Sequence, residues 1–463
     1  MELVYKPSDR PPIGKALVFA FQQLLAILAA TIAVPMIVGN GMSTSAALFG
    51  AGVGTLVYQI FTKFKSPVFL GSSFAFLSSM AAAFAGGVAV AVGYLGLLIG
   101  AVLAGLVYVV ISLVVKKVGT KWISVIMPAV VIGPTVAIIG LSLAGNAIGD
   151  LFNGGIKVLN VSICNPFVAL LCGLVTLFTV IVCSVYGKKM MKMIPFIIGI
   201  LAGYAVATIF TIIGNITEND ALRIINFALF EDMQWIPDFT FVKAFFGKGA
   251  FDFGDVGFFS YFGTIAVAYV PVAFVVFAEH IADHKNLSTV IESDLLEDPG
   301  LSNTLLGDGV GSIAGAFFGG CPNTTYGESV GCVAISGNAS VFCTTITAIM
   351  AIAISFLAPF VTFLATIPSC VMGGVCVALY GFIAVSGLKM IQKVDLNDNR
   401  NLFVVSVILI AGVGGMVITI GKITITSVAC ALILGIITNV ITNRKKVQAS
   451  AETIEDTTTE EIE

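Results

Sequence analysis

Apolar runs of about twenty residues recur along nearly the whole chain, separated by short polar or charged segments. Most of these runs are long enough to cross a bilayer as a helix, whereas the tenth is short. The third and tenth runs are rich in Gly, Ser, Thr and Pro, so we expect broken or partly extended segments there. The pattern predicts an all-α polytopic membrane protein with about fourteen spans, at 14–38, 44–61, 66–85, 91–115, 122–144, 166–186, 193–214, 258–282, 302–320, 323–337, 341–364, 367–388, 401–420 and 425–442.

The composition agrees with this class. The chain is 58% hydrophobic and 11% charged, whereas soluble proteins average about 25% charged residues. The net charge of −3 includes an acidic tail at 452–463, so it gives no indication of a nucleic-acid partner. Nine cysteines form no Cys-x-x-Cys pair, and His280 and His284 are the only histidines. We therefore expect no disulfide, no metal site and no cofactor.

The lysines and arginines orient the spans. If the N-terminus lies inside, eighteen of them fall on the inner side and five on the outer side. Positive charge favours the cytoplasmic side, so both termini are predicted to be cytoplasmic. Residues 215–257 then form an extracellular loop with short amphipathic helices, and 283–301 form an inner loop with another surface helix. The tail at 447–463 is predicted to be disordered.

A short motif occurs twice, with an offset of 240 residues. Met127-Pro128-Ala-Val-Val131-Ile-Gly133 recurs as Ile367-Pro368-Ser-Cys-Val371-Met-Gly373 with Pro, Val and Gly at the same spacing. The two copies open the fifth and twelfth spans, and the interrupted third and tenth segments are also seven spans apart. An odd offset inverts the second half, as in many secondary transporters. Chance similarity between Gly- and Pro-rich membrane segments is the alternative.

Four acidic residues stand out because they lie in or beside otherwise uncharged spans. They fall within about fifty residues of one another, at Glu279, Asp283, Asp308 and Glu328. A charged side chain in hydrocarbon costs roughly 2.5–3.5 kcal/mol, so such acids normally face a polar cavity. Asp308 can either accept hydrogen bonds that hold the site together or take part in proton movement.

Glu279 and Asp283 are four residues apart and share one face of the eighth span. Two carboxylates placed close together, away from water, favour retention of a proton between them. Alternatively, Asp283 and His284 mark the cytoplasmic end of the helix. His280 points to a different face from Glu279, so we expect it to pack or to form hydrogen bonds.

The two interrupted segments offer groups that suit a planar ligand. The tenth contains Pro322 and Gly327, which favour an extended piece followed by a helix start with unpaired N–H donors, and Glu328 adds an acceptor. The third supplies the flat ring of Phe74, for which ordinary core packing is the alternative. No Lys or Arg occurs within these spans to bind an inorganic anion. Donors, acceptors and an aromatic face together suit a nucleobase.

The chain resembles the nucleobase–ascorbate transporter family, also called nucleobase:cation symporter 2, from Arg10 through the fourteenth span. The matching motifs are Gly71-Ser-Ser-Phe-Ala-Phe76, Ala278-Glu279-His280, Asp298-Pro299-Gly300 and Asn323-Thr-Thr-Tyr-Gly-Glu328. The resemblance implies two inverted repeats of seven segments, with short β-strands in segments three and ten. It also implies a core domain at 14–115 and 258–364, a gate domain at 122–214 and 367–442, and a homodimer.

The resemblance also implies roles for individual residues. Glu279 and Glu328 would hydrogen-bond the base, the backbone at Gly327 would donate to it or flank it, and Phe74 would pack on its ring. Tyr380 matches a gate-domain tyrosine that faces the site. Glu279, Asp283 and Asp308 are the candidates for proton coupling.

Tyr326-Gly327-Glu328 resembles the uracil permeases, whereas purine and xanthine members more often have Gln-Asn at Glu328 and Ser329. The position of Gln23 is often histidine in the family, and that of Asp283 is histidine in some uracil permeases.

We therefore predict proton-coupled uracil uptake, by an elevator-type alternating-access mechanism, in the cytoplasmic membrane of a bacterium. A purine or xanthine symporter on the same fold is the main alternative, and a channel is a second. An enzyme would need a nucleophile–base pair or metal ligands among the spans, which the sequence does not offer. The sequence leaves open whether sodium replaces the proton.

Overall fold

The computed structural model describes residues 3–119, 128–154, 157–158, 161–162, 164–188, 190–231, 233–420 and 423–442. The predicted tail at 447–463, the start of the fifth span and Met127 of the repeated motif lie outside them. In the described part the chain is mostly helical, with three short antiparallel strand pairs.

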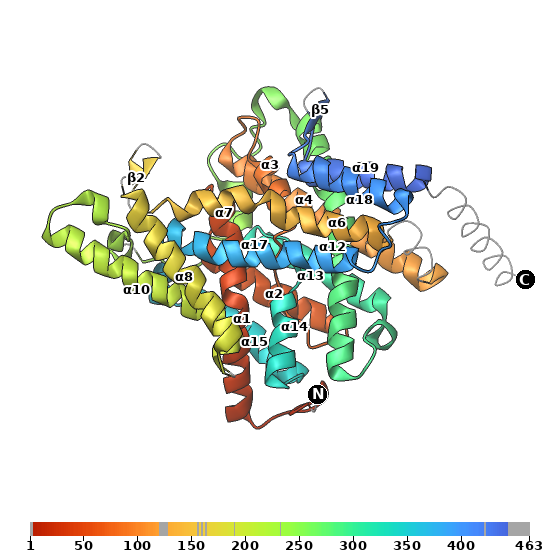
Figure 1. The fold of residues 1–463 in the computed structure, drawn as a ribbon, viewed down its shortest axis with the longest axis horizontal. Coiled ribbons are helices and arrows are strands. Elements are labelled where there is room, and N and C mark those ends of the chain that lie inside the picture. The colour runs from red at the N-terminus through yellow and green to blue at the C-terminus, as the bar shows by residue number, and fades with distance from the viewer. Residues whose placement is uncertain are drawn as a thin grey trace, which may run out of the picture.

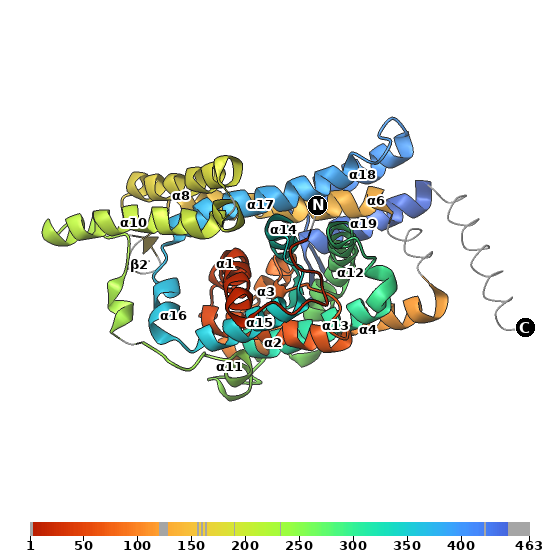
Figure 2. The ribbon, with the colours of Figure 1, turned by 90° about the horizontal axis from the view of Figure 1, so that it is seen from below.

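The helices form two layers that face each other in Figure 2. We name each layer after its central helix. The α13 layer contains α1 (Ile13–Val38), α2 (Thr44–Phe61), α3 (Leu77–Ala83), α4 (Val90–Val118), α12 (Phe258–Ile291), α13 (Leu301–Gly319), α14 (Gly327–Ser336), α15 (Val341–Ser355) and α16 (Ala358–Ala365). The α17 layer contains α6 (Ala129–Ser142), α7 (Ala144–Leu151), α8 (Pro166–Tyr186), α10 (Pro195–Ile216), α17 (Ser369–Ile391), α18 (Asn399–Val413) and α19 (Ser427–Thr442).

Each layer is built from two stretches that are far apart in sequence (Figure 1). In the α13 layer, α13 packs against α2 and α4, and α15 packs against α1 and α2. In the α17 layer, α17 packs against α6, α7 and α8, and α18 packs against α6 and α19. The chain crosses between the layers after α4, after α10 and after α16.

Small residues set the distance between the central helices of the α13 layer. A side chain at Gly50 of α2 would collide with the carbonyl of Gly315 on α13, and one at Gly54 would collide with the carbonyl of Gly311 and with Asn323. Helices in membranes associate closely where small residues allow their backbones to touch. The α2–α13 contact therefore gives this layer a tightly packed centre.

The interrupted third and tenth segments meet at this centre, and each contains the short strand that the family resemblance implies. Strand β1 (Leu70–Ser72) pairs antiparallel with β4 (Asn323–Thr325), with Gly71 opposite Thr324. Thr55 of α2 extends the pairing, since its hydroxyl bonds both the N–H and the carbonyl of Leu70, at 2.9 and 3.2 Å. Both strands are buried, and hydrogen bonds from Thr55 to Leu70 and from Tyr326 to the Ser72 carbonyl supply protein partners where water is excluded.

Eight helices in the described part are long and apolar enough to cross a membrane, or nine if α15 and α16, bent by 83°, count as one span. The protein is therefore a multi-pass membrane protein. The remaining connections are short: β2 (Lys157–Val158) with β3 (Val161–Ser162), β5 (Ile418–Ile420) with β6 (Ile423–Ile425), α9 (Met190–Met193) and the π-helical turn η4 (Leu296–Gly300). The predicted short helices of the 215–257 loop are η1 (Asp220–Leu222), η2 (Phe227–Phe230), α11 (Thr240–Phe246) and η3 (Gly254–Val256).

Three predicted spans differ from the structure in the length or continuity of their helices. Helix α12 of the eighth span continues beyond 282 to Ile291 and takes up the start of the predicted inner loop. The span at 401–420 ends as a helix at Val413 and continues into β5. The span at 341–364 is broken into α15 and α16. Hydropathy locates an apolar run but does not register a bend or a change from helix to strand inside it.

Candidate functional site

A cavity of about 930 Å³ lies between the two layers. One wall comes from α12 and α14, and the other from α6, α10 and α17. Glu279, Asp283 and Glu328 line one end of it together with Gly327. A recess of about 50 Å³ adjoins that end and shares Glu279, Gly327 and Glu328 with it. Three of the four acids singled out in the sequence therefore meet at one place.

Helix α12 presents Glu279 and Asp283 one turn apart on the same cavity wall. The carboxylate of Asp283 accepts a hydrogen bond of 2.7 Å from the hydroxyl of Thr325, the last residue of β4. Glu279 is partly exposed to the cavity, and its carboxylate makes no hydrogen bond to another residue in the described part of the chain. Glu279 is thus available to a ligand.

The end of β4 turns directly into α14, which begins at Gly327. The first amides of a helix have no carbonyl partner one turn earlier, so Gly327 and Glu328 bring N–H donors and a carboxylate to the same wall. A Cβ on Gly327 would meet only the Asp283 carboxylate, at 4.0 Å. Glycine at this position therefore keeps the floor of the cavity open.

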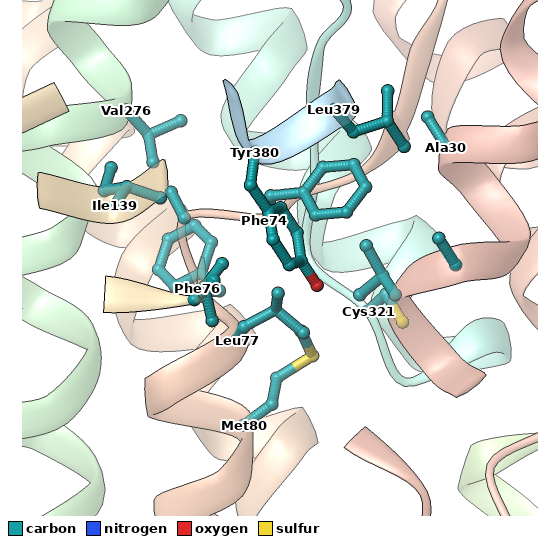
Figure 3. Close-up of a cluster of buried hydrophobic side chains, with 14 of the residues drawn as sticks. Ala30, Phe74, Phe76, Leu77, Met80, Ile139, Val276, Cys321, Leu379 and Tyr380 are labelled. Atoms are coloured by element: carbon teal, nitrogen blue, oxygen red, sulfur yellow. The ribbon is translucent and has the colours of Figure 1, made fainter. Parts of the chain in front are cut away.

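Phe74 lines the recess, whereas Tyr380 does not line either space. The Tyr380 ring meets the Phe74 ring edge to face, with centroids 5.9 Å apart, and is 3% exposed. In Figure 3 the Tyr380 side chain points from α17 into a cluster with Phe74, Leu77 and Met80. Tyr380 thus supports Phe74 from the opposite layer.

Asp308 lies apart from the other three acids. It is 1% exposed on α13, and its carboxylate contacts Nδ1 of His280 at 2.7 Å. Nε2 of His280 contacts the hydroxyl of Thr304 at 3.0 Å. Asp308 lines a separate space of about 10 Å³ with Tyr108 and Asn323. The predicted hydrogen-bonding role of His280 is therefore confirmed, and its partner is Asp308.

The alternative that Asp283 and His284 mark a helix end was wrong. His284 is fully buried, and its Nε2 lies 2.7 Å from the hydroxyl of Tyr58 on α2. Its Nδ1 contacts the carbonyl of His280 at 2.8 Å, one turn earlier. Tyr58 and Thr325, which lie on other elements, contact His284 and Asp283 inside the fold, and α12 continues for two further turns.

Several residues that line or support the site were not predicted. Gln23 links α1 to α14 and α15, since it donates to the Ser329 hydroxyl at 3.1 Å and accepts from Thr347 at 3.0 Å. The sequence signal for it was only its departure from the histidine frequent in the family. Lys285, Lys389 and Lys393 also line the large cavity. Among the described residues, no group of three His, Cys, Asp or Glu is arranged to hold a metal ion.

The site is a cavity lined by three acids between the two layers of a multi-pass helical membrane protein. The transmembrane domain of the cyanobacterial bicarbonate transporter BicA has this fold, with a TM-score of 0.62 and 16% identity over 94% of this chain and 100% of that one. SLC26A9 is similar, with a TM-score of 0.60 and 12% identity over 93% of this chain and 65% of that one.

The sequence profile described as the Permease family matches residues 14–421, and the chain belongs to this family. A uracil permease of Bacillus caldolyticus is 38% identical over 443 residues, which cover 94% of this chain and 93% of the relative. A uracil permease of Escherichia coli strain K12 is 34% identical over 432 residues, which cover 93% and 91%. These matches confirm the resemblance drawn from the motifs.

Proposed function

We propose that this protein carries uracil into a bacterial cell together with protons. The observation that carries the proposal is the recess where Glu279, the start of α14 and Phe74 meet. Uracil alternates N–H donors with carbonyl acceptors around a flat ring. The two glutamates accept from its N–H groups, the amide at Gly327 donates to a carbonyl, and Phe74 packs against its face. The names of the relatives support the choice of base.

We assign the coupling proton to Glu279 and Asp283, which share the cavity wall. Two carboxylates one turn apart hold a proton between them more readily than either would alone. Asp308 does not line this cavity, and its partner is a buried histidine. We therefore propose that Asp308 helps to position α12 and that it does not carry the transported proton.

The two layers support an elevator mechanism with the predicted domain boundaries. In this proposal the α13 layer, at 14–115 and 258–364, is the core that carries the base. The α17 layer, at 122–214 and 367–442, is the gate, against which the core slides. The protein works as a homodimer in the cytoplasmic membrane, with fourteen segments in two inverted repeats and both termini inside.

Uptake of labelled bases into proteoliposomes, with and without an imposed pH gradient, tests the proposal. We expect uracil to accumulate above its equilibrium level only when the lumen is the more alkaline side. Accumulation of xanthine or guanine in preference to uracil would favour the purine alternative, and flux that never exceeds equilibrium would favour a channel. A Glu279→Gln variant that still concentrates uracil would exclude Glu279 as the proton carrier.

A further inference from the structure

The large cavity extends well beyond the acids that we assign to uracil. Its volume of about 930 Å³ compares with about 50 Å³ for the recess beside Phe74. A single pyrimidine ring in the recess leaves most of this space for other groups. Sites of this size in proteins commonly hold ligands larger than one ring. The chemistry of the remaining lining therefore indicates what else can bind.

Three lysines line the large cavity but not the recess, and they come from both layers. Lys285 lies on α12, and Lys389 and Lys393 lie at the end of α17 and just after it. All three are exposed, and none forms an ion pair with any residue that the structure describes. The preference for positive charge on the cytoplasmic side accounts for lysines near that surface. The lining of one cavity by lysines from both layers, with Lys393 two residues beyond α17, is a further observation.

The spacing of residues along α12 separates the acidic end of the cavity, at Glu279, from its basic end, at Lys285. Lys285 follows Glu279 by six residues, which is about 9 Å along a helix axis. Two neutral polar side chains, Asn286 of α12 and Ser386 of α17, line the cavity together with these residues. The lining thus offers acceptors for a base, hydrogen-bonding groups for hydroxyls, and positive charge for an anion.

We propose that this cavity binds a pyrimidine ribonucleoside 5′-monophosphate. The base occupies the recess at Glu279 and Glu328, the ribose hydroxyls meet Asn286 and Ser386, and the phosphate lies among the three lysines. Lysine is a common phosphate ligand in proteins and acts as a point charge. The inference rests on the proposed uracil function, because it places the same base at the same acids.

Such a ligand would tie the two layers together, since it contacts Lys285 on one layer and Lys389 and Lys393 on the other. A core held to its gate cannot slide, so the nucleotide acts as an inhibitor from the side on which the lysines lie. Such a nucleotide is the product of one class of reaction that consumes a free base. In that reaction the ring nitrogen displaces diphosphate from C1 of a ribose 5-phosphate 1-diphosphate donor and loses its proton. The cavity thereby couples import to the level of that product.

The test measures labelled uracil uptake into proteoliposomes loaded with UMP, uridine or inorganic phosphate. Equilibrium dialysis with labelled UMP measures binding independently of transport. We expect UMP to inhibit uptake from one side of the membrane only, and uridine or phosphate at equal concentration to inhibit at least about tenfold more weakly. Inhibition is expressed relative to the uptake of the same protein without nucleotide.

The variant Lys285→Gln/Lys389→Gln/Lys393→Gln should raise the inhibitory UMP concentration about tenfold or more. The matched control Lys116→Gln/Lys117→Gln changes exposed lysines at the end of α4, outside the cavity lining, and should leave inhibition unchanged. Inhibition by phosphate alone that equals inhibition by UMP would show that the lysines bind any anion, and would overturn the proposal. Equal inhibition without nucleotide in proteoliposomes made with anionic lipid would do the same. Uracil uptake that UMP does not inhibit would refute the inference while the proposed function stands, whereas absence of uracil uptake would refute the function itself.

Discussion

Two glycines close to the recess make a matched test of the structure, because the same substitution should have opposite consequences at each. Gly71 lies on β1, and a Cβ there would collide with the ring of Tyr326, whose hydroxyl donates to the Ser72 carbonyl at 2.8 Å. A Cβ on Gly327 would have only the Asp283 carboxylate within reach, at 4.0 Å. Neither glycine has a positive φ, so steric contact alone decides the outcome.

Gly71→Ala should destabilise the fold by about 1–3 kcal/mol, the usual cost of forcing extra atoms into a packed core. The Tyr326 ring must move, which disturbs the pairing of β1 with β4. Gly327→Ala should leave stability unchanged or raise it by up to about 1 kcal/mol, because alanine restricts the unfolded chain. Its methyl group nevertheless enters the cavity beside Asp283, so uracil affinity should fall.

Thermal unfolding in detergent and equilibrium binding of labelled uracil measure the two effects separately. Gly71→Ala should unfold at a lower temperature than the wild type, and Gly327→Ala should unfold normally but bind more weakly. If Gly71→Ala keeps the wild-type midpoint while Gly327→Ala binds uracil normally, the placement of β1, β4 and the cavity floor is incorrect.

Three further predictions concern charged groups. Glu328→Gln should lower uracil affinity about 10- to 150-fold, because a charge-assisted hydrogen bond contributes roughly 1.5–3 kcal/mol, and unchanged binding would argue against direct contact. His280→Leu leaves the Asp308 carboxylate buried without its partner and should lower the free energy of unfolding by about 3–5 kcal/mol. Asp308→Asn keeps an acceptor for His280, so in the same thermal assay it should cost less, and the reverse order would contradict the assigned pairing. Lys65→Gln removes the ion pair with Asp298, in which both side chains are about half exposed or more. The free energy of unfolding should therefore change by less than about 1 kcal/mol, and uracil uptake should be normal.

The sequence predicts those parts of the fold that depend on local pattern. The helix at 166–186 has the predicted bounds, and the Pro and Gly residues of two distant segments correctly indicated extended pieces, which form short strands. The end of α12 could not be predicted, because polar residues at Asp283 and His284 normally indicate a helix end. Only the folded chain brings Thr325 and Tyr58 to them.

The candidate site also contains residues that the sequence could identify and residues that only the fold reveals. Glu279 and Glu328 were identifiable because isolated acids in apolar segments are costly. The separation of Asp308 from the cavity depends on the direction in which α13 faces, and the placement of Tyr380 behind Phe74 depends on how the layers meet. The three cavity lysines served in the sequence analysis only as evidence for orientation. They come from two parts of the chain about one hundred residues apart, so only the folded structure shows that they line one cavity.

The strand pair at the centre of the α13 layer has a consequence for how the protein is made. Ser72 and its partner Asn323 are separated by about 250 residues. At a synthesis rate of about 5–20 residues per second, β1 waits roughly 13–50 seconds before β4 leaves the ribosome. During that interval its amides have no strand partner in a bilayer that offers no water to replace one. Nascent chains that stop short of β4 should therefore be preferred targets for membrane proteases and insertion chaperones.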